Sequence, residues 1–175
     1  MSKTMGVASL WMISRARRAA ISTIAPMVDL SRGRIGSIPP TRWQEPYMIG
    51  FLTMLISIVA KLETRGRLDG DDLGLAQAQA WQAITGLSDD RIGEDICLLS
   101  ANADPDFWRG CSNAARFFDA LYGRQDPVDP DIRELCEDAV LAPAPALTPN
   151  EARAFGRAGA IAAALWARYF DDRIC

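Results

Sequence analysis

Fifteen consecutive residues, from Pro46 to Ala60, carry no charge, and this run constrains the fold more than any other feature of the sequence. A helix that crosses a membrane needs about 20 apolar residues, whereas this run is bounded by Glu45 and Lys61. A helix that is apolar on nearly all sides is typical of a protein core. The run therefore predicts a buried central helix that continues to about Thr64, and it predicts no transmembrane span.

A narrow polar stripe follows one face of this central helix. Its members recur at the spacing of three and four residues that places side chains on one side of a helix: Gly50, Thr53, Ser57 and Lys61. Because most of these side chains are small, we expect a neighbouring helix to approach closely along this face.

Apolar residues recur with helical spacing along most of the chain, and no stretch shows the alternation of a half-buried strand. The sequence therefore predicts an all-α fold, a compact bundle of about six to seven helices around the buried apolar central helix. The first helix is expected from about residue 5 to Ala25, because Pro26 disfavours helical backbone in the residue before it. Residues 31–40 are rich in glycine, serine and proline and are expected to form a loop.

Capping residues mark the starts of several later helices. Asp104 and Asp129 each precede a proline, which favours the first helical position. Ser88 is the expected N-cap of another helix, and Thr148 with Glu151 forms a capping box. The capping box is expected to open one long amphipathic last helix. Its apolar stripe consists of Phe155, Gly159, Ala162, Trp166 and Tyr169.

The chain contains no histidine, which removes the commonest general base and the commonest neutral metal ligand. Its four cysteines form no close pair of the kind that binds zinc: Cys97, Cys111, Cys136 and Cys175. Glycine loops for nucleotides and nucleophile-elbow motifs are also missing from the sequence. These absences favour a non-catalytic protein without a cofactor. Cys111 and Cys136 fall on apolar helical stripes and are expected in the core.

Charge divides the chain into two parts. Residues 1–42 carry seven basic and one acidic residue, a net charge of +6, whereas residues 43–175 carry twelve basic and twenty-one acidic residues, a net charge of −9. We treat residues 1–42 as a basic arm of one helix and a loop, and residues 43–175 as an acidic helical domain. The arm either lies on its own acidic body or meets an anionic partner.

These features favour a helical interaction or adaptor protein that binds a partner protein, or a second copy of itself, through the arm. The candidate partner-binding residues are Arg15, Arg17, Arg18, Arg32 and Arg34. One alternative is a peripheral protein whose arm binds anionic lipid, with Trp11, Met12 and Ile13 inserted, or binds nucleic acid. No secretory signal is recognisable, so a cytoplasmic location is expected, either in solution or at the membrane periphery. The preference for arginine over lysine is typical of a bacterial protein.

The densest acidic cluster suggests a second alternative, a helical domain that binds a cation or small ligand. Asp69, Asp71 and Asp72 are its candidate metal ligands, because hard cations prefer carboxylate oxygens. The pattern departs from a calcium-binding EF-hand, since Leu73 and Ala80 stand where two ligands are required. Carboxylates also stabilise the first turn of a helix, which explains the same cluster without a metal.

Overall fold

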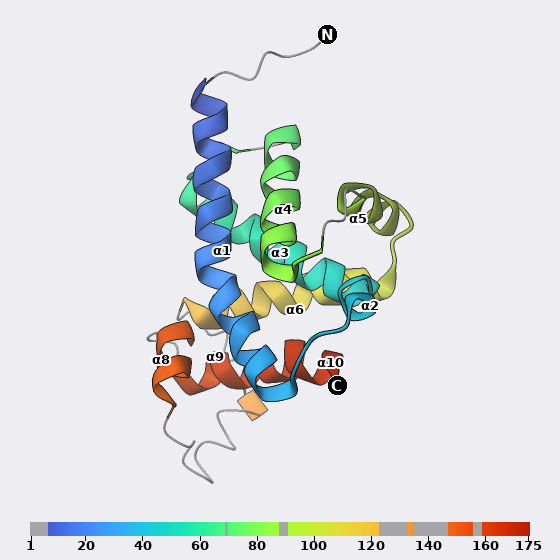
Figure 1. Ribbon diagram of the computed structural model, residues 1–175. Helices are drawn as coiled ribbons and strands as arrows, with labels where there is room; N and C mark the ends of the chain where they lie inside the picture. The colour runs from blue at the N-terminus through green and yellow to red at the C-terminus, as the bar shows by residue number, and fades with distance from the viewer. Residues whose placement is uncertain (1–6, 69, 88–90, 123–132, 135–146, 156–158) are drawn as a thin grey trace.

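In the computed structural model, every regular element of the described residues is helical (Figure 1). The described residues are 7–68, 70–87, 91–122, 133–134, 147–155 and 159–175. The helices are α1 Val7–Ile35, α2 Pro40–Trp43, α3 Pro46–Glu63, α4 Gly70–Thr85, α5 Ile92–Ala101, α6 Pro105–Leu121, α8 Pro149–Phe155, α9 Gly159–Trp166, the π-helix η2 Ala167–Asp171 and α10 Asp172–Ile174. The prediction of an all-α bundle is confirmed.

Helix α3 occupies the centre of this bundle. Figure 1 shows α1 and α4 side by side, with α3 crossing behind them and α6 beneath, and all three pack against α3. Within the described part of the chain, α3 is the one helix long and apolar enough to cross a membrane, and 61% of it is buried inside the protein. Such burial is typical of a core helix, and the prediction of a buried apolar centre is confirmed.

The backbones of α3 and α6 touch where they cross. A Cβ atom added at Gly50 would lie 2.1 Å from the carbonyl oxygen of Phe107, and one at Gly110 would lie 2.2 Å from the carbonyl oxygen of Tyr47. The thiol of Cys111 lies 3.5 Å from the carbonyl oxygen of Gly50 in the same contact. The close approach expected along the polar stripe of α3 is therefore present at Gly50, where it joins α3 to α6.

Further along the same stripe, α3 meets α4 through hydrogen bonds. The side-chain amide of Gln77 donates to the hydroxyl of Ser57 at 2.5 Å and to the carbonyl oxygen of Thr53 at 3.4 Å. The stripe thus serves two neighbours, one by backbone contact and one by polar pairing.

Large aromatic side chains fill the space between α3, α6 and the C-terminal helices. Trp166 stacks on Phe170 with ring centroids 4.4 Å apart, and both rings contact Phe51 of α3. Two further rings complete the cluster. The ring centroid of Phe117 in α6 lies 5.2 Å from that of Trp166, and the ring centroid of Trp43 in α2 lies 5.8 Å from that of Phe170. This cluster fixes the C-terminal helices on the central pair.

Helix α1 does not end at Pro26, so that prediction is wrong. The helix passes through the proline and continues to Ile35, which makes residues 31–35 helical instead of loop. Met27 and Val28 beyond the proline are fully buried. Each such side chain contributes about 1.5–3 kcal/mol, so the two together offset the roughly 3 kcal/mol cost of an internal proline. The helix stops before Gly36, whose φ of +86° suits glycine.

The single long last helix is also not what the structure contains. α8 ends at Phe155 and α9 begins at Gly159, whose φ of +58° is incompatible with a continuous right-handed helix. Four members of the predicted apolar stripe are nevertheless buried: Phe155, Ala162, Trp166 and Tyr169. The spacing identified the buried residues correctly, but it did not reveal the break at the glycine.

Two of the predicted caps are confirmed. The Asp104 carboxylate accepts from the backbone N–H groups of the second and third residues of α6 at 3.0 and 2.9 Å. Thr148 and Glu151 form the reciprocal bonds of a capping box at the start of α8. The predicted caps Ser88 and Asp129 lie outside the described residues, as does Cys136.

Candidate functional site

Two of the five candidate arginines, Arg32 and Arg34, join the second half of α1 to other helices. Arg32 pairs with Asp29 at 3.0 Å and donates to the carbonyl oxygen of Ile84 at the end of α4, at 2.9 Å. Arg34 pairs with Asp171 at 3.2 Å and lies 4.0 Å from Glu151. These two side chains hold the second half of α1 against α4 and the C-terminal helices.

Arg34 belongs to a buried polar network that joins α1 to η2. The hydroxyl of Ser31 donates to the carboxylate of Asp171 and accepts from the indole N–H of Trp166 at 2.8 Å. Burial raises the pKa of Asp171, while the Ser31 hydrogen bond and the Arg34 charge oppose that rise. The network satisfies polar groups inside an apolar core, so its role in this structure is to anchor the C-terminal helices.

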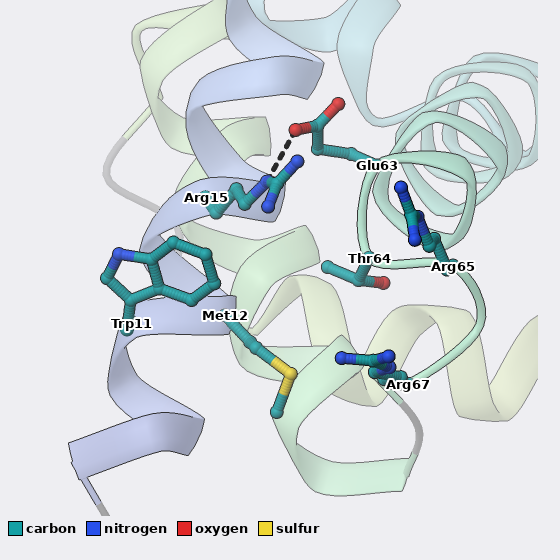
Figure 2. A pocket seen from close by; sticks show the side chains of 7 residues that line it. All are labelled: Trp11, Met12, Arg15, Glu63, Thr64, Arg65 and Arg67. Atoms are coloured by element: carbon teal, nitrogen blue, oxygen red, sulfur yellow. Dashed lines mark hydrogen bonds and ion pairs between the residues drawn. The ribbon is translucent and has the colours of Figure 1, made fainter.

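The other half of α1 borders a cavity of about 280 Å³ that we call the basic notch. The notch lies between α1 and the turn that follows α3 (Figure 2). Its lining residues are Trp11, Met12, Arg15, Glu63, Thr64, Arg65 and Arg67. Of the five candidate arginines, only Arg15 lines it.

Arg15 is held by two contacts in the notch. Its Nε donates to the carboxylate of Glu63 at 2.5 Å, and its guanidinium carbon lies 5.3 Å from the ring centroid of Trp11. Both members of the ion pair are more than one-third exposed, so the pair adds little to stability. Its main consequence is positional, because it orients Arg15 beside the Trp11 ring, which is 56% exposed.

The turn after α3 brings Arg65 and Arg67 to the opposite wall. The N–H of Gly66 donates to the carbonyl oxygen of Lys61 at 2.8 Å, and the N–H of Arg65 donates to that of Leu62 at 3.2 Å. These two bonds define a Schellman motif at the helix end. Figure 2 shows Arg65 and Arg67 on this wall, with Arg67 extending toward Met12 and Arg65 beside Glu63, across the space from Trp11.

Arg65 occupies the left-handed position of that motif, with a φ of +53°. Glycine is the usual residue at such a position, because a side chain there costs about 1–2 kcal/mol. The sequence interpretation missed Arg65 and Arg67, since it looked for basic residues only within 1–42. The available signal was the Arg65-Gly66-Arg67 triplet at the end of the apolar run.

The notch combines three guanidinium groups with one carboxylate, a net charge of +2. Glu63 is engaged by Arg15. Within the described residues, the side chains of Arg65 and Arg67 have no ion-pair partner, and both residues are exposed. The notch therefore has two arginine side chains available to bind an anion from solution.

Arg17 and Arg18 lie outside the notch. The Nε of Arg18 donates to the carbonyl oxygen of Ser14 in its own helix, at 3.4 Å. The Nε of Arg17 is buried and has no hydrogen-bond partner in the part of the chain that the structure describes. The structure thus separates the five predicted arginines into different environments instead of gathering them on one surface.

The candidate metal ligands Asp71 and Asp72 lie in the first turn of α4. Ser9 of α1 donates a hydrogen bond to the carboxylate of Asp72, whereas Asp69 lies outside the described residues. Among the residues that are described, no group of three or more acidic or cysteine side chains is arranged to hold a metal ion. The position of Asp71 and Asp72 matches the favourable interaction of carboxylates with a helix N-terminus.

A second, shallower concavity of about 410 Å³ lies between α3 and α5. Pro46, Ile49, Leu98 and Leu99 give it an apolar lining, and Leu98 is 60% exposed. Its charged residues, Arg91 and Asp95, are of opposite sign. It therefore lacks the net charge that distinguishes the basic notch.

The fold and the basic notch together define a helical protein with a small cavity lined by three arginines. The chain matches no protein-family model, no curated protein and no solved structure. Its function is therefore argued from the notch itself.

Proposed function

We propose that this chain is a non-catalytic helical interaction protein that binds an acidic segment of a partner protein in the basic notch. The observation that carries the proposal is the pair of open arginines, Arg65 and Arg67, facing the exposed ring of Trp11 across a cavity. Arginine and tryptophan are the residue types that most often dominate the energy of protein interfaces.

The distribution of charge supports an acidic partner. Arg32 and Arg34 are neutralised by carboxylates and carbonyl groups of the chain itself, whereas the notch keeps a net charge of +2. Charge complementarity of this kind speeds association and selects the partner. Among these basic groups, those of the notch are thus the least occupied by acidic groups of the protein itself, and they are the most available to an anion from a partner.

The backbone at Arg65 supports a role for its side chain. Glycine would adopt the left-handed conformation without strain, so the arginine at this position makes the fold less stable than glycine would. In return, the arginine places a guanidinium group in the notch. Such a local sacrifice of stability is common where a side chain binds a ligand.

Two observations favour a protein partner over a membrane. Ile13, which a lipid-bound arm would insert together with Trp11 and Met12, is only 3% exposed and packs inside the protein. The notch is also concave, so its arginines are better placed to receive a protruding side chain than the flat surface of a bilayer. Nucleic acid is disfavoured because two open arginines provide few of the phosphate contacts on which such binding depends.

The test is capture of partners by the tagged full chain in host lysate, with cross-linking. Arg65→Gln/Arg67→Gln is compared with the wild type and with Arg109→Gln/Arg153→Gln, which removes two charges from exposed positions outside the notch. Circular dichroism verifies that each variant folds. We expect a captured protein that the notch variant alone loses, and that an acidic peptide from its own sequence displaces.

Identical capture by wild type and notch variant contradicts the proposal. Binding of anionic vesicles or DNA that the notch variant retains also contradicts it, because the arm then acts elsewhere.

A further inference from the structure

We propose that the basic notch selects a doubly charged phosphomonoester group, carried on a side chain of the partner's acidic segment. This inference rests on the proposed function and specifies the chemistry of the ligand that the notch accepts.

Charge balance is the first argument. Three arginines and Glu63 give the notch a net charge of +2. A phosphomonoester carries a charge of about −1.5 to −2 at neutral pH, whereas a single carboxylate carries −1. The phosphomonoester therefore neutralises the notch with one group, and a carboxylate leaves about half of the charge uncompensated.

The donor geometry is the second argument. Each guanidinium is a planar fork that can place two N–H groups on one phosphate. Arg65 and Arg67 stand two residues apart on one turn, and Arg15 faces them from α1. Figure 2 shows these three side chains around one space. A phosphomonoester presents three acceptor oxygens, one for each arginine of the lining, whereas a carboxylate presents two.

The lining beside the arginines fits a protein side chain. Trp11 and Met12 form an apolar wall next to the basic wall, so the carbon atoms that carry the phosphate find an apolar contact. The cavity of about 280 Å³ leaves room for neighbouring residues of a peptide as well as the phosphate.

Glu63 acts as an internal competitor in this arrangement. Its carboxylate occupies Arg15 in the unliganded protein, and a more highly charged phosphate competes for the same guanidinium. Replacing Glu63 by glutamine keeps the side-chain shape and removes the competing charge. We therefore expect Glu63→Gln to bind the phosphorylated segment more tightly than the wild type.

The absence of histidine provides a pH test of this chemistry. Without histidine, none of the residue types that line the notch ordinarily titrates between pH 5.5 and 7.5. A phosphomonoester, by contrast, acquires its second charge near pH 6. Its doubly charged fraction rises about fourfold over this interval. A glutamate side chain is ionised throughout, so its binding stays nearly constant.

The experiment measures binding of two short blocked peptides to the full chain by fluorescence anisotropy. One peptide has a central phosphoserine between leucines, and the other has glutamate in its place. We expect the phosphoserine peptide to bind more tightly, and its affinity to rise up to about fourfold from pH 5.5 to 7.5. Arg65→Gln/Arg67→Gln weakens it at least about tenfold, Glu63→Gln strengthens it, and Arg109→Gln/Arg153→Gln leaves it unchanged.

The outcomes separate this inference from the proposed function. Equal binding of the two peptides, lost together in the notch variant, overturns phosphate selectivity and leaves an acidic partner in place. If neither peptide binds but partner capture still depends on the notch, phosphate selectivity is likewise overturned and the acidic partner remains. Notch-independent binding of the phosphoserine peptide overturns both proposals. Preference for phosphatidylcholine vesicles containing phosphatidic acid overturns the assignment of the phosphate to a protein segment.

Discussion

The contact between α3 and α6 predicts that Gly110→Ala strongly destabilises the protein. The added methyl group would lie 2.2 Å from the carbonyl oxygen of Tyr47 and 2.8 Å from the backbone nitrogen of Phe51. Both atoms belong to the backbone of the central helix, so no rotation of a side chain relieves the overlap. The two helices must separate, which loosens the most extensive helix pair in the bundle.

The magnitude follows from two opposing effects. Overpacking a well-packed core typically costs about 1–3 kcal/mol, and a backbone clash belongs at the upper end of that range. Alanine is a better helix former than glycine by about 1 kcal/mol. The net loss is therefore about 2 kcal/mol, or about 4–8 °C in Tm for a chain of this size.

Urea unfolding followed by tryptophan fluorescence measures this loss, because Trp43, Trp81 and Trp166 are fully buried. Gly74→Ala in α4 is the matched control, since its Cβ would meet nothing within 4 Å. The control is expected to be up to about 1 kcal/mol more stable than the wild type. If Gly110→Ala behaves like Gly74→Ala, the two helix backbones do not touch and the reasoning is refuted.

Three further predictions concern the strained turn, the buried carboxyl and the thiols. Arg65→Gly is expected to raise stability by up to about 1 kcal/mol in thermal unfolding and to weaken binding at the notch. Ala103→Gly is the control, because Ala103 also has a positive φ, of +51°, and its replacement should raise stability without affecting binding. Equal binding by both variants contradicts the role of Arg65. Because burial raises the pKa of Asp171 in the folded protein, its carboxyl stabilises the fold most below its unfolded pKa of about 4. The stability of the wild type relative to Asp171→Asn should therefore fall as pH rises from about 4, and a difference that grows with pH disproves the assignment. Burial raises the pKa of Cys111 to about 11, whereas Cys97 is exposed. We therefore expect iodoacetamide at pH 8 to label Cys97 before Cys111 in a peptide-mapping time course. Equal labelling rates would show that Cys111 is accessible.

The sequence was sufficient where one local signal dominates. The charge-free run predicted the buried helix α3, and Asp104-Pro105 predicted the start of α6, because burial and capping act over a few residues. The sequence predicted a helix end at Pro26, where α1 continues, and a continuous helix at Gly159, where the helix is broken. Burial of the residues after Pro26 stabilises α1 beyond the proline. Gly159 interrupts the last helix because its φ is positive, although its spacing also fits the apolar stripe of an unbroken helix.

The candidate site was only partly predictable. Arg15 could be identified from the basic arm, but Arg65 and Arg67 lie in the part of the chain with a net negative charge. A Schellman turn directs them back toward α1, and that turn places Arg65 in a left-handed conformation that arginine rarely adopts. Arg32 and Arg34 have the same composition signal as Arg15, and only their neighbours in the fold distinguish them.

The central claim is that the basic notch receives an acidic segment of a partner protein, and cross-linking from inside the notch tests it most directly. A photoreactive phenylalanine analogue in place of Trp11 is activated in the native host, and the attached peptide is identified by mass spectrometry. The same analogue at Trp108, an exposed ring on α6, is the control. We predict that position 11 alone yields a recurrent acidic peptide, and that Arg65→Gln/Arg67→Gln removes it. The same peptides from both positions, or a peptide without acidic or phosphorylated residues, would contradict the account.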